Sequence, residues 1–147
     1  MSKQKPLKRQ GRHIELPIKH YSLAELRLGM NRLPLLLFRS DMGEEAELQI
    51  GEEITLARGQ CQDRLTGSRP SSTFAPQTLG PLVELLGCTV TEATALQSGE
   101  IRIHLSNAIV LSIAPSHGYE GWHFRWKTNR NHPASLVLHG ADGHLIS

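Results

Sequence analysis

The segment that decides the fold is SHGYEGWHFRW, residues 116–126, which contains both tryptophans of the chain. In a β-strand successive side chains point to opposite faces, so Trp122, Phe124 and Trp126 share one face. The side chains between them are polar. A strand with one large apolar face packs against a hydrophobic core, so this pattern predicts that Trp122 and Phe124 are buried.

Trp126 stands at the end of this predicted strand, among the cationic residues Arg125, Lys127 and Arg130. We expect its ring to be partly exposed. An aromatic ring beside cations can stack on a nucleic-acid base or anchor a protein interface. Trp126 and Arg125 are therefore candidate partner-binding residues, and burial of Trp126 in the core is the alternative.

Short runs of strand-forming residues, separated by turn signals, extend along the chain outside this segment. In several runs apolar and polar residues alternate, as in EIRIHL at 100–105. Such runs are typical of an antiparallel meander. Ser106 and Asn107 form a two-residue hairpin signal, and we expect Asn107 to take the positive φ of that turn. The predicted strands cover residues 24–28, 35–38, 46–50, 54–57, 89–96, 100–105 and 108–113.

One helix is predicted over residues 74–86, FAPQTLGPLVELL, and Gly87 can take the left-handed conformation that ends it. Apolar residues at i, i+3, i+4 and i+7 give the helix one stripe that faces the core. Pro81 fits poorly inside a helix but well at its start, so a short helix of about two turns is the alternative. The stripe consists of Leu79, Leu82, Val83 and Leu86.

These elements predict an α+β fold, in which one short helix packs on an antiparallel sheet of two meander-like halves. The halves, 24–56 and 89–113, read alike and flank the helix. The polar stretch 58–72 is predicted to be the longest loop. Residues 13–147 are expected to form a single domain, because a chain of 147 residues suits one core. The predicted core comprises Leu82, Leu86, Ile101, Ile103, Leu111, Ile113, Trp122 and Phe124.

The positive charge of the chain is concentrated at its N-terminus. The sequence has 16 Lys and Arg against 14 Asp and Glu, and residues 1–12 contain no acidic side chain. The remainder is therefore net acidic, so the chain is a basic tail on an acidic body. We predict that residues 1–12 are disordered. The candidate nucleic-acid contacts in this tail are Lys3, Lys5, Lys8, Arg9 and Arg12.

Cysteine usage and hydropathy indicate a cytoplasmic protein. Two cysteines, Cys61 and Cys88, are too few for a disulfide scaffold and are expected to be free thiols. The longest apolar run, residues 35–38, is far shorter than a membrane span, so we expect no membrane contact. The basic start lacks the apolar segment that follows it in a secretory signal.

The segment from LGPLVELLG to YEGWHF resembles a bacterial family of domains of unknown function. Those domains have a short helix ending in Leu-Leu-Gly, a strand hairpin and a Tyr-Glu-x-Trp signature. The chain departs from them at Ser106–Asn107, where the family has Asp-Gly, and at residues 127–135, which look like an insertion. A closing Asp-Gly turn and strand at 141–147 also resemble the family. The other matching positions are Leu85, Leu86, Gly87, Leu105, Leu111, Tyr119, Glu120 and Trp122.

The resemblance implies no chemistry but does imply a kind of partner. Some members resemble small immunity proteins found beside contact-dependent toxins. The sequence lacks a Walker loop, GxGxxG, GxSxG, CxxC and HExxH, and its eight histidines do not have the spacing of metal ligands. We therefore predict no catalytic residue, no cofactor and no metal.

Acidic residues gather at Glu44, Glu45, Glu52 and Glu53, around the turns of the first predicted meander. Such a cluster can face a basic partner such as the active site of a nuclease toxin, because immunity proteins exploit charge complementarity. These four glutamates are therefore candidate partner-binding residues. The alternative is a solvated sheet edge whose charges discourage aggregation.

The sequence therefore indicates a non-catalytic protein-binding module, with an immunity-like role as its specific form. One alternative is a nucleic-acid-associated protein that uses the basic tail and binds less tightly as salt rises. The other is a small enzyme with an unrecognised site, which would require a concave pocket with convergent polar groups.

Overall fold

A computed structural model describes residues 9–10, 13–27, 34–51, 53–66, 80–114, 120–127, 135–141 and 144–146. Within these residues the chain forms mainly antiparallel strands. The first seven strands are β1 (Arg9–Gln10), β2 (His13–Glu15), β3 (Ser22–Arg27), β4 (Leu35–Arg39), β5 (Glu45–Ile50), β6 (Glu53–Arg58) and β7 (Cys61–Thr66). They are followed by α1 (Gly80–Val83), β8 (Val90–Leu96), β9 (Ile101–Leu105), β10 (Ile109–Ile113), β11 (Glu120–Lys127), β12 (Ser135–Ala141) and β13 (His144–Ile146).

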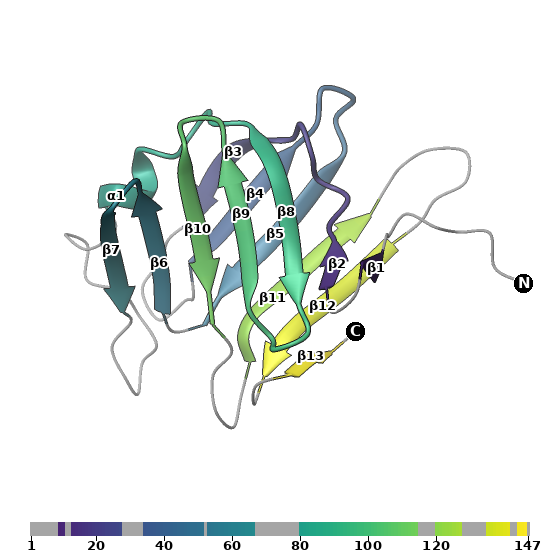
Figure 1. The fold of residues 1–147 in the computed structure, drawn as a ribbon. Coiled ribbons are helices and arrows are strands. Elements are labelled where there is room, and N and C mark those ends of the chain that lie inside the picture. Colours follow the sequence, from purple (N-terminus) through teal and green to yellow (C-terminus); the bar gives the residue numbers. More distant parts are fainter. Residues whose placement is uncertain are drawn as a thin grey trace, which may run out of the picture.

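The strands form two sheets that stack as the layers of a β-sandwich. The first sheet has the strand order β1-β2-β8-β9-β10-β6-β7, and the second has the order β13-β12-β11-β5-β4-β3. Figure 1 shows the two layers face to face, with strands that cross obliquely and with α1 beside β6 and β7. Two packed sheets bury their inner faces against each other, which explains the alternating pattern of the sequence.

The core lies between the sheets and receives every second residue of the central strands. Ile101, Ile103 and Leu105 of β9 alternate with exposed or half-buried residues, and β10 repeats the pattern. From the opposite sheet, Trp122 and Phe124 of β11 are almost fully buried. The predicted burial of both aromatics is confirmed. The Trp122 indole N–H also donates to the Gly99 carbonyl oxygen at 2.7 Å, which satisfies the polar atom of the ring.

The predicted α+β class is wrong, because the described part of the chain is mainly β and has one helix of four residues. Four strands were not predicted, namely β1, β2, β7 and β12. β7 lies inside the polar stretch 58–72, where composition indicated a loop, but it pairs with β6 along its whole length. β12 begins where an insertion was expected and pairs with both β11 and β13. Pairing with a neighbour can impose a strand on residues of weak intrinsic preference.

The helix is shorter than both predicted versions, and this changes which side chains face the core. Beyond Val83 the chain forms tighter turns, in which the Leu85 N–H donates to the Leu82 oxygen at 3.0 Å. A spacing of three residues therefore replaces the helical stripe, so Leu82 and Leu85 are fully buried. The predicted burial of Leu86 is wrong, since it is 43% exposed. Residues 74–79 lie outside the described part of the chain.

The predicted meanders exist, but they are not two halves of one sheet. β3, β4 and β5 pair in sequence order in the second sheet, while β8, β9 and β10 do so in the first. Between Ile50 and Glu53 the chain passes from one sheet to the other, and β6 then pairs with β10. Each sheet therefore contains strands from both sides of the helix.

The hairpin between β9 and β10 differs from the predicted turn. Its positive φ, 69°, belongs to Ala108 and not to Asn107, so the prediction for Asn107 is wrong. The Ala108 N–H donates to the Leu105 oxygen at 3.0 Å, and the Asn107 side chain accepts from the Ile109 N–H at 3.2 Å. The loop thus contains three residues, and such loops place their left-handed residue last.

Replacing Ala108 by glycine should stabilise the protein. A left-handed conformation costs an L-residue about 1–2 kcal/mol, whereas glycine adopts it freely at a smaller cost in unfolded-state entropy. We expect the free energy of unfolding to rise by about 0.5–1 kcal/mol in urea denaturation. Gly43, with φ 85° and open space around it, is the reciprocal control. Gly43→Ala should destabilise, and a loss of stability in Ala108→Gly would contradict the strain argument.

Candidate binding surface

The outer face of the second sheet presents charged side chains from four adjacent strands. Since Ala46, Leu48 and Ile50 of β5 point into the core, Glu45 and Glu47 point outward. Strand pairing places outward residues of β3, β4 and β11 beside them. We call this surface the charged face. It consists of Glu25, Arg27, Arg39, Glu45, Glu47 and Arg125.

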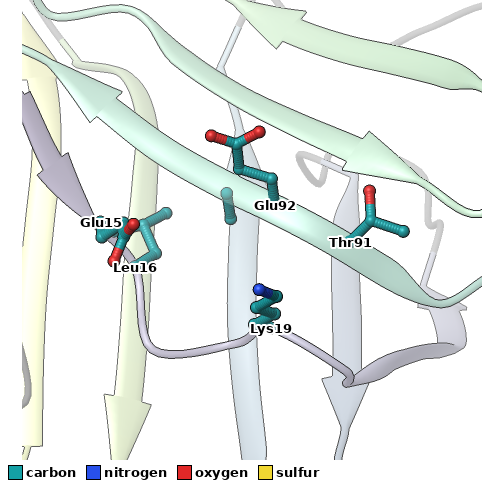
Figure 2. Close-up of a pocket in the computed structure, with 6 residues that line it drawn as sticks. Glu15, Leu16, Lys19, Thr91 and Glu92 are labelled. Atoms are coloured by element: carbon teal, nitrogen blue, oxygen red, sulfur yellow. The ribbon is translucent and has the colours of Figure 1, made fainter.

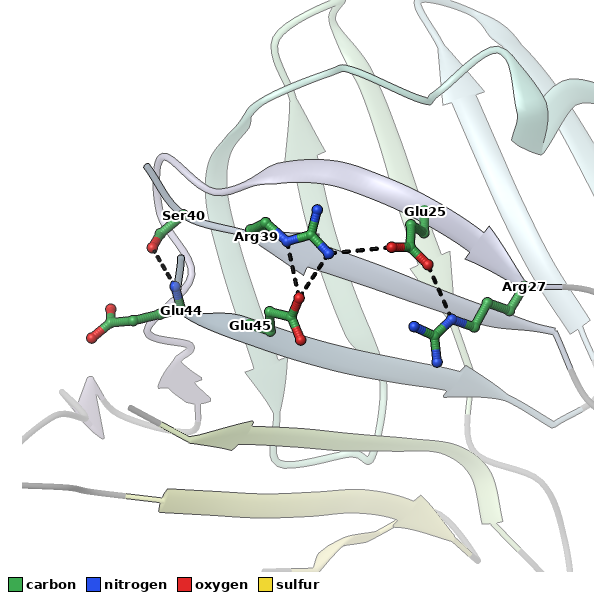
Figure 3. Close-up of polar contacts among 6 residues, drawn as sticks. All are labelled: Glu25, Arg27, Arg39, Ser40, Glu44 and Glu45. Carbon is green, nitrogen blue, oxygen red and sulfur yellow. Dashed lines mark hydrogen bonds and ion pairs between the residues drawn. The ribbon is translucent and has the colours of Figure 1, made fainter. Parts of the chain in front are cut away.

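Ion pairs connect these side chains within β3 and across neighbouring strands, as Figure 3 shows for four of them. Glu25 accepts from Arg27 Nε at 3.1 Å and from Arg39 Nη2 at 3.2 Å. Arg39 also donates to Glu45 Oε2 through Nε at 2.9 Å and Nη2 at 2.7 Å. Exposed pairs add little stability each, but a network holds its long side chains in defined positions.

These pairs change the ionisation of two groups on the charged face. Hydrogen bonds from Arg27 and then Arg39 hold the pKa of Glu25 below its ordinary value of 4.5. Hydrogen bonds to Glu45 and then Glu25 raise the pKa of Arg39, which stays charged. Glu25 and Arg39 are therefore both charged at neutral pH, and their hydrogen bond is charge-assisted.

The stability that Glu25 contributes should depend on pH in one direction. Because its pKa is lower in the folded than in the unfolded state, the contribution is present above the unfolded pKa and disappears as pH falls through the folded pKa. We expect the wild type to have a larger free energy of unfolding than Glu25→Gln at pH 7, and we expect this difference to vanish in acid. Urea denaturation across pH 2–7 measures this. A constant difference would contradict the assignment, and carboxyl NMR titration would locate the pKa directly.

Leu37 lies within the charged face but is only 1% exposed. Its register partners are Glu25 on β3 and Glu47 on β5. Arg125 of β11 pairs in turn with Glu47, at 3.9 Å between side-chain atoms. The charged face therefore surrounds an apolar position, an arrangement that periodicity alone would not predict because Leu37 is out of phase with the core residues of β4.

The predicted acidic cluster is divided between different environments. Glu44 is buried at 6% exposure, and Glu45 is paired with Arg39 in the charged face. Glu53 begins β6 of the other sheet, and Glu52 lies outside the described residues. The six side chains of the charged face carry equal numbers of positive and negative charges, so this surface is neutral overall.

Trp126 is buried at 8% exposure rather than partly exposed as expected. Its indole N–H donates to the Tyr21 hydroxyl oxygen at 3.1 Å, and the Tyr21 O–H donates to Glu44 Oε1 at 3.2 Å. The Glu44 backbone N–H donates to Ser40 Oγ at 3.0 Å, which fixes the turn before β5 (Figure 3). These bonds thus link Trp126 of β11 to the residues that precede β3 and β5, while its neighbour Arg125 is exposed in the charged face.

The basic tail is largely outside the described part of the chain. Arg9 belongs to β1, whose residues pair with β2, so ordered backbone begins within the predicted tail. Lys3, Lys5, Lys8 and Arg12 lie outside the described residues.

A second candidate site is a pocket of about 320 Å³ in the first sheet, where β8 runs beside the chain that follows β2. Leu16 N–H donates to the Ala93 oxygen at 2.9 Å on one side, and His20 N–H donates to the Val90 oxygen at 2.8 Å on the other. Between these bonds the first chain makes a turn and β8 carries a bulge, so the chains separate. Figure 2 shows Lys19 extending from the turn towards β8.

Neither a metal cluster nor a spanning helix is found in the described residues. These residues contain no group of three or more His, Cys, Asp or Glu side chains arranged to hold a metal ion. None of their helical segments has the length and hydropathy needed to cross a membrane.

Comparison with known proteins identifies a family to which the chain is similar. The sequence model of a "Family of unknown function (DUF6188)" matches residues 15–140, which include the charged face and the pocket. No curated protein matches the chain, and no solved structure does so either.

Proposed function

The chain belongs to this family of unknown function, and from that premise we propose that it is a non-catalytic protein-binding module whose binding surface is the charged face. The observation that carries the proposal is the cross-strand network centred on Arg39. The charged side chains of this network are exposed and are held in a fixed arrangement by their ion pairs. The buried Leu37 lies among them on the outer side of the sheet.

Preorganisation is the physical argument for binding at this surface. Association costs entropy when long side chains become immobilised, at about 0.5–1.5 kcal/mol for each. The guanidinium groups of Arg27 and Arg39 are already held by carboxylates in the free protein. Binding of a partner therefore causes a smaller further loss of side-chain entropy. Arginine is also enriched in protein interfaces, since its planar group offers several directed donors.

The neutral charge of this surface indicates how a partner would be recognised. A surface whose charges all have one sign accelerates association through long-range attraction. Alternating charges instead favour binding of a partner whose own charges are complementary at each position. Binding should therefore be only modestly sensitive to salt. Binding of nucleic acid through the basic tail would instead weaken steeply as salt rises.

Within this proposal the partner is a toxin that the module neutralises by binding, as the family resemblance implies. We place the protein in the bacterial cytoplasm. The free thiols of Cys61 and Cys88 support a reducing compartment, since Cys61 is exposed and unpaired. Glu44 and Glu45 do not offer free negative charge to a basic partner, because Glu44 is buried and Glu45 is ion-paired with Arg39.

The proposal is tested with a charge reversal in the centre of the network. Arg39→Glu brings a third carboxylate to Glu25 and Glu45, and should reduce partner affinity at least about tenfold, since losing an interfacial charge costs about 2–5 kcal/mol. Arg102→Glu is a matched control, because Arg102 is likewise ion-paired with a glutamate, Glu100, at 3.0 Å, but belongs to the other sheet. Arg39→Gln serves if the reversal disturbs folding.

The measurement is quantitative affinity capture from the native host after nuclease treatment, followed by titration calorimetry with the purified partner. A protein retained by wild type and Arg102→Glu, but lost with Arg39→Glu and Arg39→Gln, would support the proposal. Equal capture by all variants would refute the assignment of the surface. Recovery of nucleic acid alone would favour the tail alternative instead.

A further inference from the structure

The strongest unexplained feature is a set of unpaired charges at the pocket between β8 and the chain after β2. Most of the Asp, Glu, Lys and Arg residues whose side chains are described take part in an ion pair or hydrogen bond. The exceptions are Asp41, in the turn before β5, and Glu15, Lys19 and Glu92. The last three line the same pocket.

The pocket has this charged rim and reaches two buried apolar residues. Leu16 and Ala93 line it and are themselves buried, at 4% and 3% exposure, so the cavity reaches the edge of the core. Thr91 adds a hydroxyl group at the rim. The cavity volume of about 320 Å³ is at the lower end of the range for small-molecule sites, about 300–1,000 Å³. The site therefore suits a small ligand with both apolar and charged parts.

The backbone fixes the shape of this pocket. Hydrogen bonds of 2.7–2.9 Å close it at both ends, from Leu16 to Ala93 on one side and between Val90 and the residues His20 and Tyr21 on the other. His20 has a φ of 77°, which L-residues rarely adopt, so the turn carrying Lys19 is held in a specific conformation. Lys19 and Glu92 thus project from backbone that is fixed on both sides.

We propose that this pocket binds a small zwitterion of the α-amino-acid class, with its ammonium at the Glu15 and Glu92 carboxylates and its carboxylate at the Lys19 ammonium. The side chain of the ligand lies on Leu16 and Ala93. A ligand with only one charge satisfies one part of the rim and leaves the other unpaired. A zwitterion satisfies both, because directed hydrogen bonds between charged groups are stronger than those between neutral ones.

This site is independent of the proposed protein-binding surface. The pocket belongs to the first sheet and the charged face to the outer side of the second, so either can fail experimentally without affecting the other. It is a binding site for a small molecule, a function that the charged face does not supply.

The experiment titrates the full chain with a panel of L-α-amino acids while amide resonances are followed by two-dimensional NMR. Propylamine and propionate, which each carry one of the two charges of L-alanine on a three-carbon chain, are the comparison ligands. We expect saturable shifts confined to residues 15–20 and 91–93, with at least one amino acid binding about tenfold more tightly than either comparison ligand.

Two variants test the assigned contacts. Lys19→Met should abolish the preference for amino acids while propylamine binds at least as well as before, because the carboxylate loses its partner and a repulsive cation is removed. Glu92→Gln should weaken the binding of both the amino acids and propylamine. Glu84→Gln, an exposed glutamate outside this pocket, is the matched control and should change nothing.

The proposal is overturned if no amino acid gives saturable shifts at ligand concentrations of tens of millimolar. A dissociation constant above that range is weaker than that of most specific ligands. It is also overturned if Lys19→Met binds amino acids as wild type does, or if the shifts lie elsewhere. Preferential binding that depends on Lys19 and Glu92 establishes the site.

Discussion

Trp122→Ala should lower the free energy of unfolding by about 3–5 kcal/mol, the cost of emptying a fully buried aromatic site. The side chain is 1% exposed between the sheets, and its indole N–H satisfies the Gly99 carbonyl oxygen at 2.7 Å. The substitution therefore creates a cavity and also removes a hydrogen bond to a buried acceptor. Most domains have only about 5–15 kcal/mol of stability, so this variant should be close to unfolding at ambient temperature.

Urea denaturation followed by fluorescence measures this loss, because Trp126 remains as the reporter. Trp122→Phe should fall between the alanine variant and wild type, since it keeps the aromatic packing but leaves Gly99 without its donor. Met42→Ala is the control, as Met42 is 78% exposed in a turn and should cost little. A loss below about 1 kcal/mol for Trp122→Ala would contradict a packed core at this position.

Tyr21→Phe should destabilise the protein by about 1–3 kcal/mol, although it removes a single oxygen atom. That hydroxyl accepts from Trp126 and donates to Glu44, and all three side chains are buried. Its loss leaves an indole N–H and a carboxylate each short of a hydrogen bond. A buried donor without its acceptor, such as the Trp126 indole N–H, costs about 1–3 kcal/mol.

A double-mutant cycle with Trp126→Phe isolates the hydrogen bond between the two aromatic residues. If the bond contributes as the geometry indicates, the double variant should lose less stability than the sum of the single variants. Additive effects, or a loss below about 0.5 kcal/mol for Tyr21→Phe, would mean that other groups satisfy these atoms.

Much of the fold could be predicted wherever local periodicity and tertiary packing agree. A strand with regular alternation, such as β9, was found because its apolar residues point to one face only. β7 and β12 were not found because pairing with neighbours, rather than composition, stabilises them. The helix was too long because the stripe of Leu82 and Leu86 assumed four-residue spacing, whereas tighter turns follow Val83.

Most of the residues of the candidate sites could not be predicted from the sequence, because the sites depend on contacts between residues that are distant in the chain. Glu25 and Arg39 belong to different strands and meet only through register, and Glu47 meets Arg125 in the same way. Glu44 and Glu45 are adjacent in sequence, but Glu44 ends the turn before β5 and is buried, whereas Glu45 begins the strand and is exposed. Counting acidic residues could not reveal that difference.

The passage of the chain between the sheets has a consequence for how the protein reaches its native state. β2 pairs with β8, β5 with β11 and β6 with β10, so each sheet needs strands from both ends of the chain. Closing loops over such long sequence separations costs entropy before the native contacts form and compensate for it. All-β proteins dominated by such non-local pairings fold in milliseconds to seconds. A fragment cut at α1 should therefore not fold alone, whereas the two complementary fragments should assemble when mixed.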